Sequence, residues 1–380
     1  MLDNPLNSIF KTHKESTLFG RYINTEHITP LLKKHARNFK IEVIGQSVLE
    51  ESIYSIKIGF GKKKILMWSQ MHGNESTTTK SIFDLLNFFG NDSNSKSILK
   101  ACTIVIVPIL NPDGAKDYTR LNVNKIDLNR DAQNLTQPES RALRALYNKF
   151  KPHYCFNLHG QRTIFSAGST SNSASLSFLS PAQDSNCTIT DNRKVAMSLI
   201  VKINTMLQKE LPNQVGIYDD TFNINCIGDT FQSFNVPTIL FEAGHIANDY
   251  DREEVRRYVF KSYLTALNTI TNDEIDLKDY REYLTIPQNE KLFFDVIIKN
   301  ALYNNKLLDI AIQFQEKLIG DTVCFIPKVE RIAKLNSFFA HKYLDANNSE
   351  VLDGDNNTLT VGSERDFVLI NNAKLSLKLK

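Results

Sequence analysis

Short apolar runs alternate with amphipathic segments along the first 272 residues of the chain. Apolar runs of strand length predict strands at 40–47, 52–60, 63–70, 103–110, 154–156 and 238–241. Apolar positions at helical spacing predict helices that include residues 82–89, 143–147, 192–210 and 249–270, and Thr136 and Glu139 have the spacing of a capping box. This alternation predicts an α/β fold with a mixed, largely parallel sheet flanked by helices.

The pattern changes near residue 273. From residue 288 onward the sequence predicts no long helix, and short apolar runs predict strands at 293–298, 307–314, 323–326, 338–344 and 367–370. Asn-Asn pairs within this part of the chain supply turn residues. We therefore expect a larger α/β domain over residues 1–275 and a small all-β domain over residues 285–380.

Composition narrows the class of protein. The 380-residue chain carries a net charge of only +3, which argues against a nucleic-acid partner. Its five Cys residues lack a Cys-x-x-Cys spacing, which favours free thiols in a reducing compartment. No segment approaches the ~18 apolar residues of a membrane span, and the first residues lack the apolar run of a signal peptide. We expect a cytoplasmic protein without a membrane partner.

Polar motifs follow four of the apolar runs. They are His72-Gly73-Asn74-Glu75, Asn111-Pro112-Asp113-Gly114, Asn157-Leu158-His159-Gly160 and Phe241-Glu242-Ala243-Gly244-His245. If the strands are parallel, their carboxyl ends lie along one edge of the sheet, where open α/β sheets bind ligands. We therefore expect side chains that are far apart in the sequence to meet at one site.

The residue types in these motifs suit a metal-assisted hydrolase. A catalytic zinc needs three protein ligands, and two His with one Glu are a known set. His72 and Glu75 are three residues apart at one predicted strand end, and His159 ends another, so these three are the predicted ligands of one zinc ion. His245 is the reserve candidate. Taken singly, each residue also suits a structural role, as part of a helix start or as a hydrogen-bonded turn histidine.

Glu242 is the candidate general base. It follows the apolar run 238–241, and a carboxylate at the end of a buried strand is costly unless it has a role or a partner. A zinc hydrolase needs such a group to take a proton from the attacking water. A salt-bridged structural Glu is the alternative.

Arginines between the second and third motifs are candidate anion binders. Arg130, beside Asn129, offers a planar fork of donors to a carboxylate, and Arg120 could stabilise an oxyanion. The structural alternative is ion pairing with Asp117, Asp127 or Asp131. We call Asn129 and Arg130 the clamp. Because the acidic Asp131 directly follows the clamp, a substrate ammonium group is an alternative to a carboxylate as the group that the clamp binds.

These motifs together resemble the zinc metallocarboxypeptidase family, over about residues 40 to 272. The resemblance implies that His72, Glu75 and His159 bind zinc and that Glu242 is the catalytic carboxylate. It also implies that Arg120 assists the scissile carbonyl, that Asn129 and Arg130 hold the substrate's terminal carboxylate, and that Tyr218 closes over the substrate. Asp127-Leu128-Asn129-Arg130 is also similar to the succinylglutamate desuccinylase and aspartoacylase branch, whose small C-terminal β domain is similar to residues 288–380.

We therefore predict a zinc-dependent hydrolase that removes C-terminal residues from peptides. The alternatives are an N-acyl amino acid deacylase and a catalytically silent peptide-binding protein. In the first two cases the substrate carries a free carboxylate. Two interpretations are open for three acidic residues. They favour substrates with basic side chains, or they are solvated residues of a loop. The three residues are Asp219, Asp220 and Asp229. The Ser-rich segment 166–185 is expected to be a surface loop or a lid over the site.

Overall fold

The computed structural model describes residues 5–379, which form two compact units. The first contains the chain up to Gln161 together with Ala174–Asn289. The second contains Arg162–Ser173 together with the chain from Glu290 onward. The segment that follows His159 in the sequence therefore belongs to the same unit as the C-terminal strands.

The first unit is built on an eight-stranded sheet in the order β1-β2-β4-β3-β5-β9-β7-β8. Its strands are β1 (Lys40–Gln46), β2 (Ser52–Gly59), β3 (Lys63–Ser69), β4 (Cys102–Val107), β5 (Tyr154–Gly160), β7 (Leu176–Leu179), β8 (Val215–Ile217) and β9 (Thr238–Ala243). The central strands β4, β3, β5 and β9 run parallel, whereas β1, β2 and β7 each pair antiparallel with a neighbour. The predicted mixed, largely parallel sheet is confirmed.

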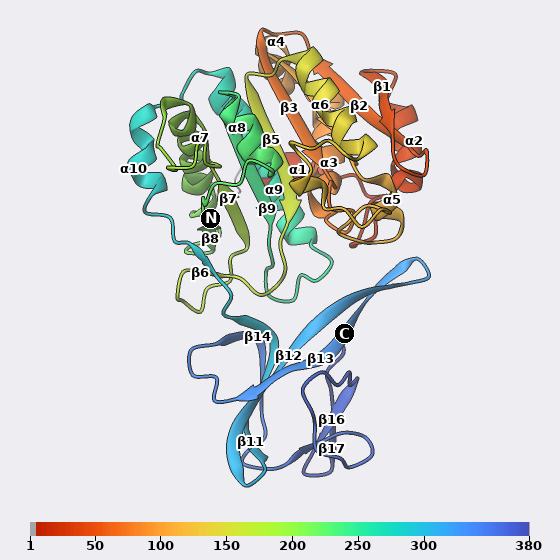
Figure 1. The fold of residues 1–380 in the computed structure, drawn as a ribbon, viewed down its shortest axis with the longest axis vertical. Helices are drawn as coiled ribbons and strands as arrows, with labels where there is room; N and C mark the ends of the chain where they lie inside the picture. The colour runs from red at the N-terminus through yellow and green to blue at the C-terminus, as the bar shows by residue number, and fades with distance from the viewer. Residues whose placement is uncertain (1–4, 380) are drawn as a thin grey trace. The chain divides into compact units, whose positions relative to one another are not determined.

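Helices cover both faces of this sheet (Figure 1). The α-helices of this unit are α1 (Pro5–His13), α2 (Thr25–His35), α3 (Thr77–Asn91), α4 (Lys96–Ala101), α5 (Pro112–Lys116), α6 (Pro138–Phe150), α7 (Asp191–Leu207), α8 (Ile227–Ser233), α9 (Glu253–Thr271) and α10 (Tyr280–Tyr283). Apolar residues of α1, α2, α3, α7 and α9 form the larger core on one face. Residues of α6 and α8 pack against Leu66, Trp68 and Cys155 on the other face.

The central strands are apolar on both faces because helices bury both. All six residues of β4 are buried, and Phe156 and Leu158 of β5 face the larger core while Cys155 faces the smaller one. This alternation places Asn157 and His159 on the Cys155 face, which α6 and α8 cover.

The expected capping box at the start of α6 is wrong. The Thr136 hydroxyl donates to Asp131 Oδ1 at 2.8 Å, and α6 begins two residues later at Pro138, whose fixed φ suits the first helical position. Asp131 therefore draws Thr136 into the preceding loop instead of leaving its side chain to cap the helix.

The second unit is built of β strands. Its four-stranded sheet has the order β13-β12-β11-β14, from β11 (Phe293–Tyr303), β12 (Lys306–Ile319), β13 (Thr322–Ala333) and β14 (Phe339–Asp345). All neighbours in it are antiparallel except β11 and β14. A smaller sheet joins β15 (Val351–Leu352), β16 (Phe367–Ile370) and β17 (Ala373–Ser376), and β6 (Ser166–Ala167) pairs with β10 (Asn289–Glu290).

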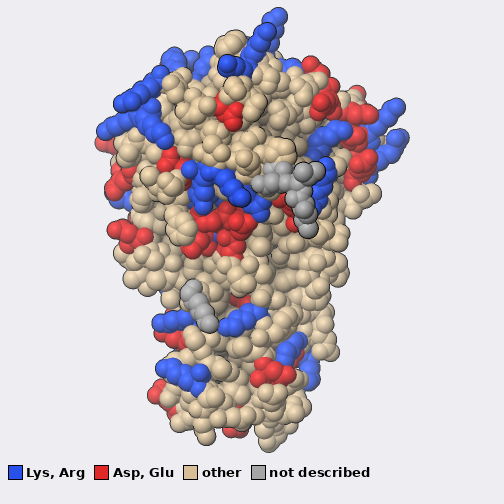
Figure 2. Space-filling model, turned by 180° about the vertical axis from the view of Figure 1, so that it is seen from behind, with Lys and Arg blue, Asp and Glu red and all other residues tan. Residues whose placement is uncertain are grey.

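The surface carries both signs of charge. On the face shown in Figure 2, Lys and Arg side chains lie interspersed with Asp and Glu side chains, in keeping with the small net charge. Among residues 5–379, no helix combines the length and the apolar character that crossing a membrane requires.

Candidate metal centre

The four predicted motifs lie along one edge of the sheet. In the parallel register, Ser69 of β3 is opposite Leu158 of β5, and His159 of β5 is opposite Glu242 of β9. The second motif is joined to the first by backbone hydrogen bonds, since Asn111 N donates to Gln70 O at 3.0 Å. The four motifs, which are spread from His72 to His245 in the sequence, thus lie together at the carboxyl ends of the strands.

The turn after β3 is set by two unusual backbone positions. Gln70 is buried with φ +45, and its Nε2 donates to Gly73 O at 2.8 Å and to Ile23 O at 2.9 Å. A Cβ built on Gly73 would lie 2.0 Å from the carbonyl carbon of Gly114, so only glycine fits where the first and second motifs touch. This packing fixes the path of the chain on both sides of His72.

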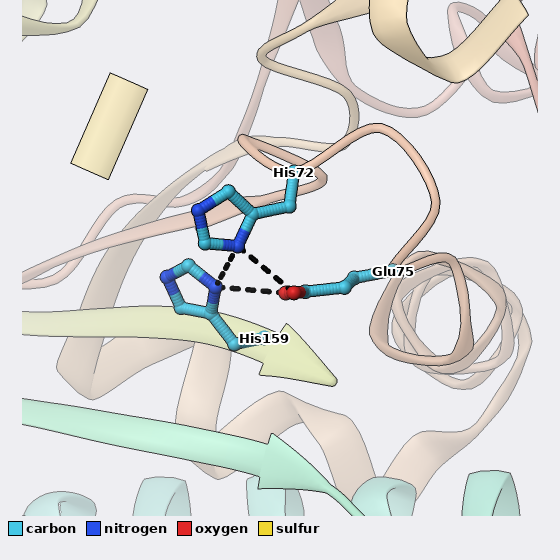
Figure 3. Close-up of side chains that lie close together, drawn as sticks. All are labelled: His72, Glu75 and His159. Carbon is cyan, nitrogen blue, oxygen red and sulfur yellow. Dashed lines mark hydrogen bonds and ion pairs between the residues drawn. The ribbon is translucent and has the colours of Figure 1, made fainter. Parts of the chain in front are cut away.

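His72, Glu75 and His159 converge on one point (Figure 3). His72 Nδ1 lies 2.9 Å from Glu75 Oε1, His159 Nδ1 lies 2.8 Å from Glu75 Oε2, and the two Nδ1 atoms are 3.1 Å apart. Both histidines are 2% exposed. Two imidazole nitrogens facing each other across a carboxylate are a donor set that fits a catalytic zinc ion. Among the described residues this is the one group of three such side chains.

Burial and charge interactions shift the pKa values of Glu75, His159 and His72. Burial raises the pKa of Glu75, but the two histidines outweigh it and hold that pKa well below its usual range. Burial lowers the pKa of His159 and so favours the neutral ring that a metal requires. Burial also opposes the charged form of His72, but Glu75 and Asp127 outweigh it and raise its pKa.

Asp127 and Arg120 contact this group of three side chains. Asp127 Oδ1 lies 3.0 Å from His72 Nε2, the ring nitrogen that points away from Glu75. Arg120 donates to Asp127 Oδ2 at 3.2 Å and to Glu75 Oε1 at 3.3 Å. From the sequence Asp127 is expected only as an ion-pair partner for an arginine, and the sequence does not predict its contact with His72. An acidic residue within a motif-bearing loop was the only signal available.

Glu242 is a half-buried residue, and one of its carboxylate oxygens, Oε2, is buried. Its Oε2 makes no hydrogen bond with the described residues. Burial, and then the nearby charge of Glu75, raise its pKa well above the usual range, while Arg120 and Arg252 act in the opposite direction. A salt bridge to Oε2, which the structural alternative for Glu242 would require, is therefore absent among the described residues.

The predicted carboxylate clamp lies beside the first turn of α8. Asn129 Oδ1 accepts from Ile227 N at 3.2 Å, and the exposed Arg130 donates to Asn129 O at 2.8 Å. Asp131 faces away from this pair, because its oxygens accept from the backbone of Thr136 and Gln137, each at 2.9 Å. Asp131 is thereby engaged in shaping the loop before α6.

The other predicted residues fall into two groups. Tyr218 lies near the site, since the charges of Glu242 and Glu75 add to burial in raising its pKa, and its hydroxyl donates to Gln161 Oε1 at 2.8 Å. Of the three acids, Asp219 accepts from Thr221 N and Asp220 pairs with Arg193 at 2.6 Å, whereas Asp229 is 8% exposed.

The expectation of a surface loop over 166–185 is wrong for its middle part. Leu176–Leu179 form β7, a strand of the main sheet that pairs with β9. Ser175, Ser177 and Ser180 are fully buried, and each hydroxyl hydrogen-bonds inside the first unit. Serine suits this strand because backbone and side-chain acceptors satisfy its hydroxyl groups.

Comparison with known proteins gives one family. A model of the zinc carboxypeptidase family matches residues 25–239. The chain is 31% identical to the probable carboxypeptidase 2 of Arthroderma benhamiae over 110 residues, which are 28% of this chain and 20% of that protein. It is 31% identical to carboxypeptidase 2 of Trichophyton rubrum over 100 residues, 26% of this chain and 19% of that one. The match thus spans about a fifth of these relatives' length.

Solved structures share the fold. A putative carboxypeptidase A from Shewanella denitrificans superposes with a TM-score of 0.56 at 18% identity, over 65% of this chain and 69% of that one. A metallo-carboxypeptidase from Pseudomonas aeruginosa, in complex with (2-guanidinoethylmercapto)succinic acid, has a TM-score of 0.52 at 16% identity, over 67% and 70% of the two chains. The predicted resemblance to the zinc metallocarboxypeptidase family is confirmed by the family model, and these structures share its fold.

Proposed function

This chain belongs to the zinc carboxypeptidase family, and we propose that it is a zinc-dependent hydrolase that removes C-terminal residues from peptides. The observation that carries the proposal is the convergence of His72, Glu75 and His159 beside the unpartnered oxygen of Glu242. A zinc ion held by the first three residues would supply an activated water molecule and a Lewis acid for the scissile carbonyl.

Glu242 is the proposed general base. Its raised pKa makes it a better proton acceptor than an exposed carboxylate, and no donor among residues 5–379 competes with the water molecule for its Oε2. It takes a proton from the attacking water and then delivers that proton to the leaving amine. The register of β5 and β9 supports this role, because it sets Glu242 opposite the ligand His159.

Arg120 is the proposed stabiliser of the tetrahedral oxyanion. Its guanidinium group already lies 3.3 Å from the ligand carboxylate of Glu75, and its side chain is 48% exposed, so a substrate can approach it. Its pairing with Asp127 holds the fork in place. The ion pair of Arg120 with Asp127 is thus compatible with the proposed catalytic role of Arg120.

Asn129 and Arg130 are proposed to hold the substrate's free carboxylate, with Tyr218 covering the bound substrate. A planar guanidinium group binds a carboxylate in bidentate fashion, which would restrict cleavage to the last peptide bond. The succinic acid compound bound to the Pseudomonas aeruginosa relative supports carboxylate recognition in this fold.

The decisive experiment compares wild-type protein with Glu242→Gln after loading with one equivalent of zinc. We expect the wild type to release C-terminal residues from peptides, and the variant to retain zinc by elemental analysis while losing turnover. Normal turnover by the variant would rule out the base assignment. A wild type that hydrolyses N-acyl amino acids and no peptides would favour the deacylase alternative, and a protein that binds no zinc would favour the silent peptide-binding alternative.

A further inference from the structure

Asn157 presents a buried amide oxygen that no described residue satisfies. The residue is 2% exposed, and its Oδ1 has no hydrogen-bond partner within residues 5–379. It lies on β5 two positions before the ligand His159, so both side chains are on the face of the sheet that α6 and α8 cover. An unsatisfied acceptor in such a place costs stability unless a ligand donor completes it.

The first turn of α8 connects Asn157 with the proposed carboxylate clamp. A Cβ built on Gly228 would lie 3.9 Å from Asn157 Nδ2, so the amide faces this glycine. The preceding residue, Ile227, donates its backbone N–H to Oδ1 of Asn129, the clamp residue. A substrate whose terminal carboxylate is held at Asn129 therefore has its last side chain close to Gly228 and Asn157.

Asp229 adds a carboxylate at the same turn. It is 8% exposed and accepts from Asn223 N at 3.2 Å. Burial raises its pKa to about 6, while the charges of Arg130 and Arg193 act in the opposite direction. At neutral pH this group is largely ionised, so the first turn of α8 carries a negative charge one residue after Gly228, which the Asn157 amide faces.

We propose that Asn157 and Asp229 recognise the side chain of the substrate's C-terminal residue and favour one that ends in an amino or guanidino group. The inference rests on the proposed carboxypeptidase function. A basic side chain would donate to Asn157 Oδ1 and would balance the charge of Asp229. An aliphatic or aromatic side chain would leave both groups desolvated without a partner, so it would be cleaved more slowly.

The experiment measures kcat/KM on matched peptides that differ only in a C-terminal Lys, Arg, Gln, Leu, Phe or Glu. We expect the zinc-loaded wild type to prefer Lys and Arg over Leu. Asn157→Leu, which keeps the branch at Cγ but removes the polar atoms, should lower the Lys-to-Leu ratio by roughly 10- to 100-fold. Asn225→Leu makes the same substitution at an exposed position just before α8 and should leave the ratio unchanged.

Asp229→Asn is the second variant, because it retains an acceptor for Asn223 N if Asn157→Leu does not fold. It should also lower the Lys-to-Leu ratio. A wild type that cleaves Leu or Phe peptides faster, or two folded variants that keep the wild-type ratio, would overturn the inference.

A binding measurement separates failure of this inference from failure of the proposed function. If no peptide is cleaved, the proposed function fails. Thermal shifts with free lysine and free leucine on zinc-loaded Glu242→Gln protein then judge the inference alone. A larger shift with lysine that Asn157→Leu abolishes supports it, and equal shifts contradict it.

Discussion

Asp127 Oδ1 lies 3.0 Å from Nε2 of His72, while Nδ1 of the same ring faces Glu75 at 2.9 Å. The imidazole is therefore fixed from both sides, by the Glu75 carboxylate at Nδ1 and by the Asp127 carboxylate at Nε2. Such an outer partner sets the tautomer of a ligand histidine and raises its basicity. Asp127 is also held, since it accepts from Asn129 N at 2.9 Å and pairs with Arg120.

Asp127→Ala should weaken zinc binding by about 10- to 100-fold, because His72 loses the group that orients it. Asp127→Asn should have a smaller effect, since an amide oxygen can still accept from Nε2. Competition against a chelator of known affinity measures both. Asp117→Ala, which removes an exposed acid from the same loop region, should leave zinc affinity unchanged. Wild-type affinity in Asp127→Ala would mean that the contact does not orient the ligand.

Arg120→Met should lower kcat/KM by about 10²- to 10³-fold with zinc still bound, because the oxyanion loses its charged donor. Arg120→Lys should retain part of the activity, because it keeps the positive charge. It lacks the planar guanidinium group that reaches both Glu75 and Asp127. Steady-state kinetics with metal analysis provide the measurement. Lys116→Met, which removes an exposed cation, is the matched control, and an equal loss in both variants would argue for a general charge effect.

The position of the candidate site was predictable because strands that are buried on both faces appear in the sequence as short apolar runs. The apolar runs before His72, His159 and Glu242 are strands that helices cover on both faces, and their parallel connection brings their ends together. Residue types then indicated zinc chemistry. The order of the motifs could be compared with a family, which is why weak single motifs gave a specific prediction.

Long-range pairing was not predictable in the same way. β6 (Ser166–Ala167) pairs with β10 (Asn289–Glu290), more than 100 positions along the chain, and no local pattern reports such a partner. The sequence does not predict β7, because Ser177 within it and Ser175 just before it are polar residues whose hydroxyl groups form hydrogen bonds only in the folded chain. The contact between Asp127 and His72 likewise depends on the path of a loop and not on residue spacing.

Gly73→Ala should destabilise the protein by about 3 kcal/mol and weaken zinc binding, because the new Cβ would overlap the backbone of Gly114. The two motifs would have to separate, which moves His72 relative to Glu75. Chemical denaturation and zinc titration test this expectation. Gly90→Ala, within α3, is the control. Its Cβ would meet the flexible end of Asn38 at 3.2 Å and would lie at an ordinary contact distance of 3.8 Å from Phe39 Cζ, and alanine favours a helix. Normal zinc affinity in a folded Gly73→Ala variant would contradict the packing argument.

His35, at the end of α2, is a buried histidine that is not one of the proposed metal ligands. It is 3% exposed, stacks on Phe39 with ring centroids 5.9 Å apart, and lies 6.2 Å from the ring of Phe83. Burial, and then the charge of Lys34, lower its pKa to about 4. The folded state therefore binds this proton less readily than the unfolded chain does, and protonation favours unfolding.

The free energy of unfolding should accordingly fall as the pH drops from about 6.5, the unfolded value, toward 4, with a contribution from His35 of about 2 kcal/mol at pH 5 relative to pH 8. His35→Phe keeps an aromatic ring between Phe39 and Phe83 but cannot titrate, so its stability should change less over this range. Urea denaturation at pH 8, 6.5 and 5 measures the difference. His153→Phe, at an exposed position, should retain the wild-type pH dependence, and a His35→Phe variant that behaves as the wild type does would show that other groups cause the acid sensitivity.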